Sequence, residues 1–333
     1  SFTYNYSSRM GGAIYIENRI ESPDVSHGLG ISDSSFYGNR SESFGGAIAA
    51  SVAGTSDVSV SRCNFTNNAS LYGGALFVRR APHTTGESYV RITENTFSNN
   101  RASYGGAITI NDLSEFNDVE IKKCFFFGNA ASKGGGAVQS NGCTIENSVF
   151  SKNTALYDGG AIQTLIPDEF GMTDYIKPST VTYCTFSGNK ASGLGGAIRA
   201  AADLDLINSI LRGNEAGHLE GVGDQIYFYK DTQSTPDETI TLNIANLNIE
   251  GGLAGIHPPY LPSWIIVNSL ADNPNAPGID GHKDIDPMFA MEDDFHLMPD
   301  SPCIDAGTYS WHDRMSTDIE GNYRFYDGDG DGA

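Results

Sequence analysis

Basic side chains are scarce in this sequence. Lys and Arg number 20 against 41 Asp and Glu in 333 residues, so the formal net charge is −21. A chain this acidic does not offer a positive face to a phosphate backbone, which excludes nucleic acid as a partner. Long apolar runs are also missing, since the longest covers only about residues 264–267 and a membrane helix needs ~18 residues. The sequence therefore predicts no transmembrane segment.

Cysteine is sparse and widely spaced. The five cysteines form no C-x-x-C pair, which argues against a zinc site. A disulfide framework is not expected either, because such frameworks belong mainly to chains too small to build a core, and hydrophobic residues make up 39% of this sequence. That share also excludes a disordered chain, despite the acidity.

No stretch has the hydrophobic period of a helix; the sequence instead contains a repeat. The motif Phe-x-x-Asn occurs seven times, each followed by Gly-Gly-Ala and an aliphatic residue that start eight or nine residues after the Phe. A weaker eighth copy has Leu for Phe. The copies lie 24 to 36 residues apart and begin at Phe2, Phe36, Phe65, Phe97, Phe126, Phe150, Phe186 and Leu211. Self-similarity at such a period predicts a solenoid.

Each repeat contains at least two predicted strands. Upstream of each Phe, two positions, nearly all of them apolar, alternate with polar residues, as in Val58/Val60 and Val119/Ile121, which is typical of a strand with one buried face. The Gly-Gly-Ala segment forms a second strand, and insertions of very different length separate the two. We therefore predict an all-β fold, a right-handed single-stranded parallel β-helix with one coil per repeat.

The expected organisation follows from where the repeat stops. Residues 1–252 should form a parallel β-helix of about eight coils, and residues 253–333 a last coil and an irregular C-terminal cap with an acidic D-x-D-x-D-G tail. Within the coils, the Phe side chains are expected to stack inside the rod. The Asn side chains are expected to form a hydrogen-bonded ladder at a turn. Cys63, Cys124 and Cys184 share one inward position, and we interpret them as small buried hydrophobes.

Repeated F-x-x-N with G-G-A-[IVL] resembles the repeat of the chlamydial polymorphic outer membrane proteins and of related large secreted bacterial proteins. The resemblance covers about residues 2–226. It implies a right-handed β-helix in an adhesin, stalk or structural protein that is secreted or displayed on the bacterial cell surface. The partner implied is a glycan or a protein at the cell surface.

A second resemblance lies near the C-terminus. The motifs D-P-M-F at 286, D-F-H-L at 294 and S-P-C-I-D-A-G at 301 are similar to the end of many extracellular bacterial β-helix proteins of the pectate-lyase-like fold. In those proteins a last strand and a surface anchor follow, whereas this sequence stops at Ala333 and starts inside a coil. We expect a piece of a longer protein.

The insertions between strands recur at one corner of the predicted coil, so they should stack along one edge of the rod. This loop edge carries aromatic and polar side chains that suit contact with a glycan or a protein. Covering the coil corner is the simpler role for the same side chains. The candidate binding residues are His83, Tyr89, Phe116, Phe170 and Tyr175.

The acidic tail has the start of a calcium loop. Asp327, Asp329 and Asp331 stand at positions 1, 3 and 5 with Gly332 at position 6, and oxygen ligands at this spacing wrap a hard cation. The closing acid at position 12 would fall beyond Ala333. We therefore expect Ca²⁺ as the cofactor in the intact protein, against the alternative of a flexible acidic linker.

Two further functions stay open. A polysaccharide lyase or glycoside hydrolase of the pectate-lyase-like fold would need converging carboxylates on adjacent coils, and the outward positions of the Gly-Gly-Ala strands contain none. We therefore assign no catalytic residue and lean against an enzyme. The third possibility is a subunit of an extracellular filament that binds like subunits through open coil ends. The outward positions in question are Tyr15, Ala49, Phe77, Thr109, Gln139, Gln163, Arg199 and Tyr227.

Overall fold

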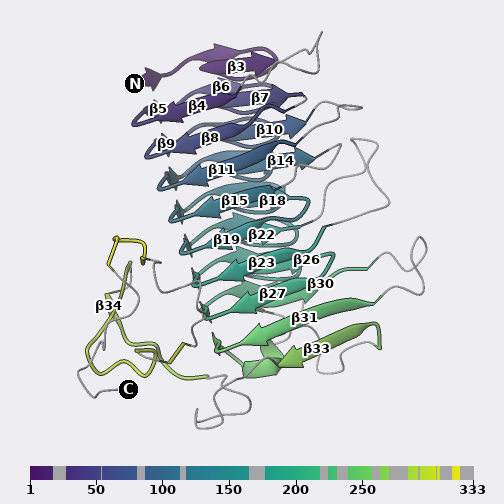
Figure 1. Cartoon of the computed structure of the whole chain (residues 1–333), viewed down its shortest axis with the longest axis vertical. Helices are drawn as coiled ribbons and strands as arrows, with labels where there is room; N and C mark the ends of the chain where they lie inside the picture. Colours follow the sequence, from purple (N-terminus) through teal and green to yellow (C-terminus); the bar gives the residue numbers. More distant parts are fainter. Residues whose placement is uncertain are drawn as a thin grey trace.

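The rod of stacked coils predicted from the sequence is the observed architecture. The computed structural model describes residues 1–17, 28–53, 55–80, 87–112, 118–164, 177–217, 224–230, 239–256, 263–269, 284–291, 293–304, 306–307 and 317–322. About half of these lie in short strands, with a single 3₁₀ turn, η2 (Gly252–Gly255), and no α-helix among them. Figure 1 shows the coils following one another from the purple N-terminal end to the green strands β31 and β33.

Three long parallel sheets form the walls of the rod. The FxxN sheet consists of β1 (Phe2–Thr3), β5 (Ser35–Tyr37), β9 (Asn64–Thr66), β12 (Thr96–Ser98), β16 (Phe125–Phe127), β20 (Val149–Ser151), β24 (Thr185–Ser187), β28 (Ile210–Arg212) and β32 (Asn248–Ile249). The GGA sheet consists of β3 (Ile14–Glu17), β7 (Ile48–Val52), β10 (Leu76–Arg80), β14 (Ile108–Asp112), β18 (Val138–Ser140), β22 (Ile162–Gln163), β26 (Ile198–Ala200) and β30 (Ile226–Phe228). The alternating sheet consists of β4 (Leu29–Ser32), β8 (Val58–Ser61), β11 (Tyr89–Thr93), β15 (Asp118–Lys122), β19 (Thr144–Glu146), β23 (Ser179–Thr182), β27 (Leu204–Ile207), β31 (Ile240–Ala245) and β33 (Ile265–Ser269).

Short strands join the FxxN sheet to the GGA sheet in every repeat except the one of β9 and β10, which has only isolated bridges there. They are β2 (Tyr6–Ser7), β6 (Arg40–Ser41), β13 (Arg101–Tyr104), β17 (Ala130–Gly134), β21 (Thr154–Ala155), β25 (Lys190–Ala191) and β29 (Glu215–Ala216). Every pair in these walls is parallel and joins strands one coil apart, as in Phe65↔Phe97 or Leu76↔Ile108. Equivalent residues of successive coils therefore lie directly over one another.

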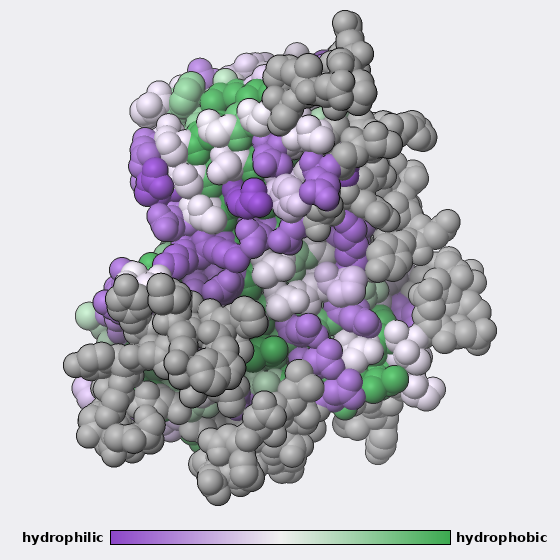
Figure 2. Space-filling view, in the orientation of Figure 1, coloured by the Kyte–Doolittle hydropathy of each residue, from purple (hydrophilic) through white to green (hydrophobic). Residues whose placement is uncertain are grey.

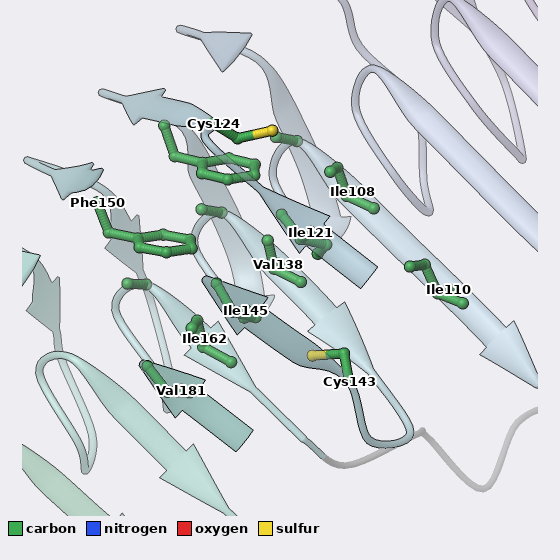
Figure 3. Packing of buried hydrophobic residues seen from close by; sticks show 14 of the residues in the cluster. Ile108, Ile110, Ile121, Cys124, Val138, Cys143, Ile145, Phe150, Ile162 and Val181 are labelled. Atoms are coloured by element: carbon green, nitrogen blue, oxygen red, sulfur yellow. The ribbon is translucent and has the colours of Figure 1, made fainter. Parts of the chain in front are cut away.

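The predicted phenylalanine column is confirmed. From Phe2 to Phe186, successive rings are stacked with centroids 4.6–4.9 Å apart and interplanar angles of 3–5°. The rings from Phe36 onward are fully buried, and burying each one contributes about 1.5–3 kcal/mol. Figure 3 shows Phe150, Cys124 and Cys143 among the aliphatic side chains of this core.

The predicted asparagine ladder is confirmed as well. At Asn100 the backbone N–H and Nδ2 both donate to Asn129 Oδ1 at 3.0 Å, and Nδ2 also donates to Phe65 O at 2.9 Å. Its own Oδ1 accepts from the backbone N–H and Nδ2 of Asn68, both at 3.0 Å. The same pattern runs through Asn5, Asn39, Asn68, Asn100, Asn129, Asn153, Asn189 and Asn214.

The ladder ends on a glutamine, Gln225, for which the sequence predicted no role. Asn214 Nδ2 donates to Gln225 Oε1 at 2.7 Å, and Gln225 Nε2 reaches back toward Asn214 O at 3.4 Å. In the eighth repeat Gly-Gly-Ala is replaced by Gly-Asp-Gln, and Gln225 occupies the position of the alanine. Its longer side chain thus supplies the acceptor that the next asparagine would otherwise provide.

Both glycines of the Gly-Gly-Ala motif are required by the backbone. Gly45 has φ of 59°, which a side chain disfavours. A β-carbon on Gly46 would lie 2.0 Å from Gly74 O in the next coil, and one on Gly74 would lie 2.1 Å from Gly106 O. The coils therefore approach one another this closely at the corner only because the second glycine of each motif lacks a side chain.

The cysteines behave as expected for buried small residues. All five are free, and Cys63, Cys124 and Cys184 are buried. Burial raises the pKa of the Cys124 thiol to about 12, so it stays protonated and unreactive. Asn95, Ser148 and Ser209, the polar members of the same column, accept hydrogen bonds from the backbone N–H groups of these three cysteines at 2.9–3.1 Å.

The β-helix continues past the eighth repeat. β32 adds a ninth strand to the FxxN sheet, with Ile249 in register with Leu211 and hence in the phenylalanine column. β33 then pairs in parallel with β31 and closes the alternating sheet. The prediction of about eight coils rested on copies of the motif, and β32 has neither its Phe nor its Asn. The division of the chain at residue 252 stays a prediction.

The described part of the C-terminal segment, residues 284–322, runs back along the side of the rod. It contains the antiparallel hairpin of β34 (Phe289–Met291) and β35 (Asp294–Leu297), which Figure 1 shows beside the lower coils. Its contacts with the middle of the rod include Asp293 with Lys152 (2.8 Å), and Thr317 with Asn147 (3.0 Å) and with Lys123. Nearer the end of the rod, Asp284 pairs with Arg212 (2.9 Å), and Asn248 Nδ2 donates to Ile285 O (2.9 Å) and contacts Cys303 Sγ (3.0 Å). This segment thus bridges several coils.

A histidine links the two parts of this segment. His296 Nδ1 contacts the Asp294 carboxylate, and His296 Nε2 lies 2.8 Å from Glu320 Oε1. The hydrogen bonds to Asp294 and Glu320 raise the pKa of His296, since both carboxylates favour the protonated ring. The hairpin is therefore joined to the turn at residues 317–322 by a charged, exposed contact.

We expect Asn100→Ala to lower the free energy of unfolding by about 1–3 kcal/mol, because it leaves partners on both neighbouring coils without their hydrogen bonds. Chemical denaturation monitored by circular dichroism measures the change. Asn64→Ala, at an exposed position of the same sheet, is the matched control and should change stability by less than about 0.5 kcal/mol. Equal midpoints for Asn100→Ala and the unsubstituted chain would contradict a stabilising ladder.

Candidate binding surfaces

Of the five candidate binding residues of the loop edge, only Tyr89 lies in the part of the chain that the structure describes. Tyr89 begins β11 and is half-buried. Its hydroxyl donates to Glu87 Oε2 at 3.0 Å, its backbone N–H donates to Asp57 Oδ1 at 3.0 Å, and the Arg91 guanidinium lies 4.8 Å from the ring centroid. The hydrogen bond to Glu87 raises the pKa of Tyr89. Tyr89 is thus held in a polar cluster rather than packed under the coil corner.

The other predicted site residues lie outside the described part of the chain. These are His83, Phe116, Phe170 and Tyr175 of the loop edge, and Asp327, Asp329 and Asp331 of the calcium motif. Whether the loop edge and the calcium loop form therefore stays a prediction. Within the described residues, no group of three or more His, Cys, Asp or Glu side chains is arranged to hold a metal ion.

The outward face of the alternating sheet carries a charge network. Arg91 pairs with Asp57 at 3.8 Å and with Glu120 at 3.5 Å, and Lys122 pairs with Glu120 at 2.8 Å and with Glu146 at 3.4 Å. Burial acts to lower the pKa of Lys122, but Glu120 and Glu146 raise it overall. Opposite charges on neighbouring strands satisfy one another here, and pairs as exposed as these stabilise a fold only slightly.

The outward positions of the GGA sheet point away from the core, but those from Ala49 to Arg199 are not open to solvent, whereas Tyr15 on the first coil is exposed. Ala49, Phe77 and Arg199 are all buried. A second layer covers the first coils: the Phe44 ring lies 4.6 Å from Phe77 and 5.4 Å from Tyr72. Phe44 and Tyr72 each occupy the position immediately before a Gly-Gly-Ala motif. The sequence analysis made no prediction for this position.

In a later coil, the position before Gly-Gly-Ala brings a carboxylate to the GGA sheet. Asp158 precedes Gly159, and its Oδ2 lies 3.1 Å from Arg199 Nε while its Oδ1 accepts from the Leu194 N–H at 2.9 Å. The guanidinium also lies 4.4 Å from the Tyr229 ring centroid. Burial lowers the pKa of Arg199. Both oxygens of Asp158 are therefore engaged in holding a buried cation, a structural arrangement rather than that of a free catalytic acid.

The FxxN sheet presents a different outward surface. In β5, β9, β12 and β16 only the central residue is buried, and the two flanking side chains are exposed or half-buried. We call this strip the FxxN face. It has two rows along the rod, one of Ser35, Asn64, Thr96 and Phe125 and one of Tyr37, Thr66, Ser98 and Phe127. At β20 the strip ends, because Val149 and Ser151 are buried.

The comparisons with known proteins agree with this geometry. The family model described as right-handed β-helix region matches residues 2–155. The model for the Chlamydia polymorphic membrane protein repeat matches residues 147–165 and 183–201. The chain is therefore a right-handed β-helix protein with repeats of the polymorphic membrane protein type. No curated protein and no solved structure is significantly similar to it.

Repeats of this type indicate a surface or outer membrane protein of the β-helix class. In the part of the chain that the structure describes, no helix has the length and apolar character needed to cross a membrane.

We expect Asp158→Asn to lower the free energy of unfolding by about 1–3 kcal/mol, because it leaves the buried Arg199 charge without its counterion while keeping an acceptor for the Leu194 N–H. Thermal or urea unfolding measures the loss. Adding Arg199→Met should recover most of it, since the unpaired charge is then gone. A double variant no more stable than Asp158→Asn would argue against the pair.

Proposed function

We propose that this protein is a rod-like adhesin, displayed on the cell surface or secreted, that contacts a glycan or protein through its lateral surfaces. The observation that supports this most is the register of the walls: the FxxN strands pair without a break from β1 to β32. A rod built this way holds side chains of different coils at fixed spacing, as a binding surface needs. The repeat type of a surface or outer membrane protein points in the same direction.

The loop edge is the first part of this surface to test. The purified chain, labelled with a fluorophore, should bind to intact epithelial cells in a saturable way that excess unlabelled protein abolishes. Tyr89→Ala should weaken this binding if His83, Tyr89, Phe116, Phe170 and Tyr175 form one contact surface. Tyr157→Ala, which removes an exposed tyrosine that is not among the candidate residues, is the matched control. Unsaturable binding would refute an adhesin.

The second candidate function is that of a carbohydrate-active enzyme. The observation that favours it is the Asp158 carboxylate beside Arg199 on the GGA sheet. We expect no turnover of pectin, alginate or chondroitin-type polymers, because this acid is committed to Arg199 and to the Leu194 N–H. Release of unsaturated or reducing ends, abolished by Asp158→Asn at unchanged fold, would reverse the order of the two candidates.

Calcium binding by Asp327, Asp329 and Asp331 belongs to the same proposal. Three carboxylates within five residues repel one another unless a cation lies between them, and an all-oxygen set selects Ca²⁺ over softer metals. In a chain that continues past Ala333, calcium should raise the melting temperature relative to excess chelator. Asp329→Asn should reduce this difference. Superimposable melts with calcium and with chelator would identify these residues as a solvated acidic linker.

A further inference from the structure

The FxxN face is uncharged on a strongly acidic protein. None of its eight outward side chains is an acid or a base, although the chain carries a net charge of −21. Charged residues stand just outside it, at the turn that precedes each strand, and Arg62 and Asp33 there neutralise one another at 2.8 Å. A neutral strip of this kind avoids both attraction and repulsion of ions.

Aromatic side chains bracket this strip. Phe125 and Phe127 flank the buried Phe126 on β16 and are 39% and 37% exposed, and Tyr37, three coils away in the row of Phe127, is 39% exposed. Between Tyr37 and Phe127 lie two hydroxyl groups, Thr66 Oγ1 and Ser98 Oγ, 3.0 Å apart. At a strand spacing of ~4.8 Å, the row is about 14 Å long.

The strip stays exposed although the C-terminal segment reaches its edge, where Thr317 contacts Lys123, two residues before Phe125. Lys152, next to β20, pairs with Asp293 of that segment at 2.8 Å, at the level where the outward residues of the FxxN sheet become buried. β5 and β9 lie on the same side of the rod in Figure 1, above the hairpin and clear of it. The exposed surface is therefore bounded at one end by Phe125 and Phe127.

We propose that the FxxN face binds an uncharged oligosaccharide lying along the rod axis; this rests on the proposed adhesin function and names its ligand class and its site. A neutral sugar chain presents apolar ring faces and hydroxyl groups in alternation. The rings of Phe125 and Phe127 pack against the apolar faces, and the hydroxyl and amide groups of Thr66, Ser98 and Asn64 exchange hydrogen bonds with the sugar hydroxyls.

Charge selects the neutral ligand over its alternatives. A uronic-acid or sialylated glycan would need a basic partner, and none of the eight outward side chains is basic. Lys152, whose Nζ lies 5.9 Å from the Phe127 ring centroid, is already paired with Asp293. Such a glycan would also approach a protein of net charge −21 against a repulsive field. The face also lacks a continuous apolar surface of the kind that anchors a protein partner, because hydroxyl and amide groups separate the aromatic ends.

The experiment measures binding of the purified chain to immobilised neutral glucose and N-acetylglucosamine oligosaccharides of at least four residues, and to uronic-acid and sialylated oligosaccharides. We expect saturable binding to one or more neutral oligosaccharides, unchanged between low and high salt. The double variant Phe125→Ser/Phe127→Ser should weaken it about tenfold or more. Thr96→Lys, which places a bulky side chain on the exposed strip without removing buried groups, should also weaken it. Tyr157→Ser is the matched aromatic control and should bind normally.

Each result has a separate meaning. Neutral binding that both FxxN-face variants leave unchanged overturns this site, while the adhesin function stands. Selective, salt-sensitive binding of acidic oligosaccharides overturns the ligand class. Saturable cell binding without any oligosaccharide binding overturns the inference alone, whereas loss of cell binding as well refutes the adhesin. Circular dichroism melts of all variants separate lost binding from lost fold.

Discussion

The asparagine ladder is the interaction on which the rest of the rod depends. Each rung uses one side chain to satisfy a backbone N–H, a carbonyl and a second amide, all of them buried and costly to leave unpaired. Because each Oδ1 accepts from the coil before it, a slip of one coil by one residue would break the rungs to both of its neighbours. The ladder thereby keeps the phenylalanines in one column and the glycine pairs in contact.

Three walls built on this common register differ in what covers them. The GGA sheet is closed by a second layer that includes Phe44 and Tyr72, and later in the chain by the Asp158–Arg199 pair. The alternating sheet is exposed, and Figure 2 shows a largely hydrophilic, purple and pale surface on this side. Its charges neutralise one another. The FxxN face is both exposed and uncharged. Function is therefore expected where the wall is open and its outward side chains carry no ion pairs.

The repeat predicted the fold because its residues act on their neighbours one coil away. Phe97 and Asn100 find their partners at a fixed offset, so a single motif implies the whole stack. The ninth FxxN strand could not be recognised from the motif, because Ile249 replaces Phe and no Asn follows it. The layer over the GGA sheet was missed because its position reads Phe44, Tyr72, Tyr104 and Asp158 in different coils, without a common residue type.

The path of the C-terminal segment could not be predicted either, since its contact between Lys123 and Thr317 joins residues 194 positions apart. That path has a mechanical consequence. A load applied near residue 322 reaches the rod first through Thr317, at Lys123 and Asn147 in mid-stack, before it reaches the contact of Cys303 with Asn248 at the last coil. It then acts in shear across several coils, whose ladders must yield together, whereas a pull on the final strand would peel coils off one by one.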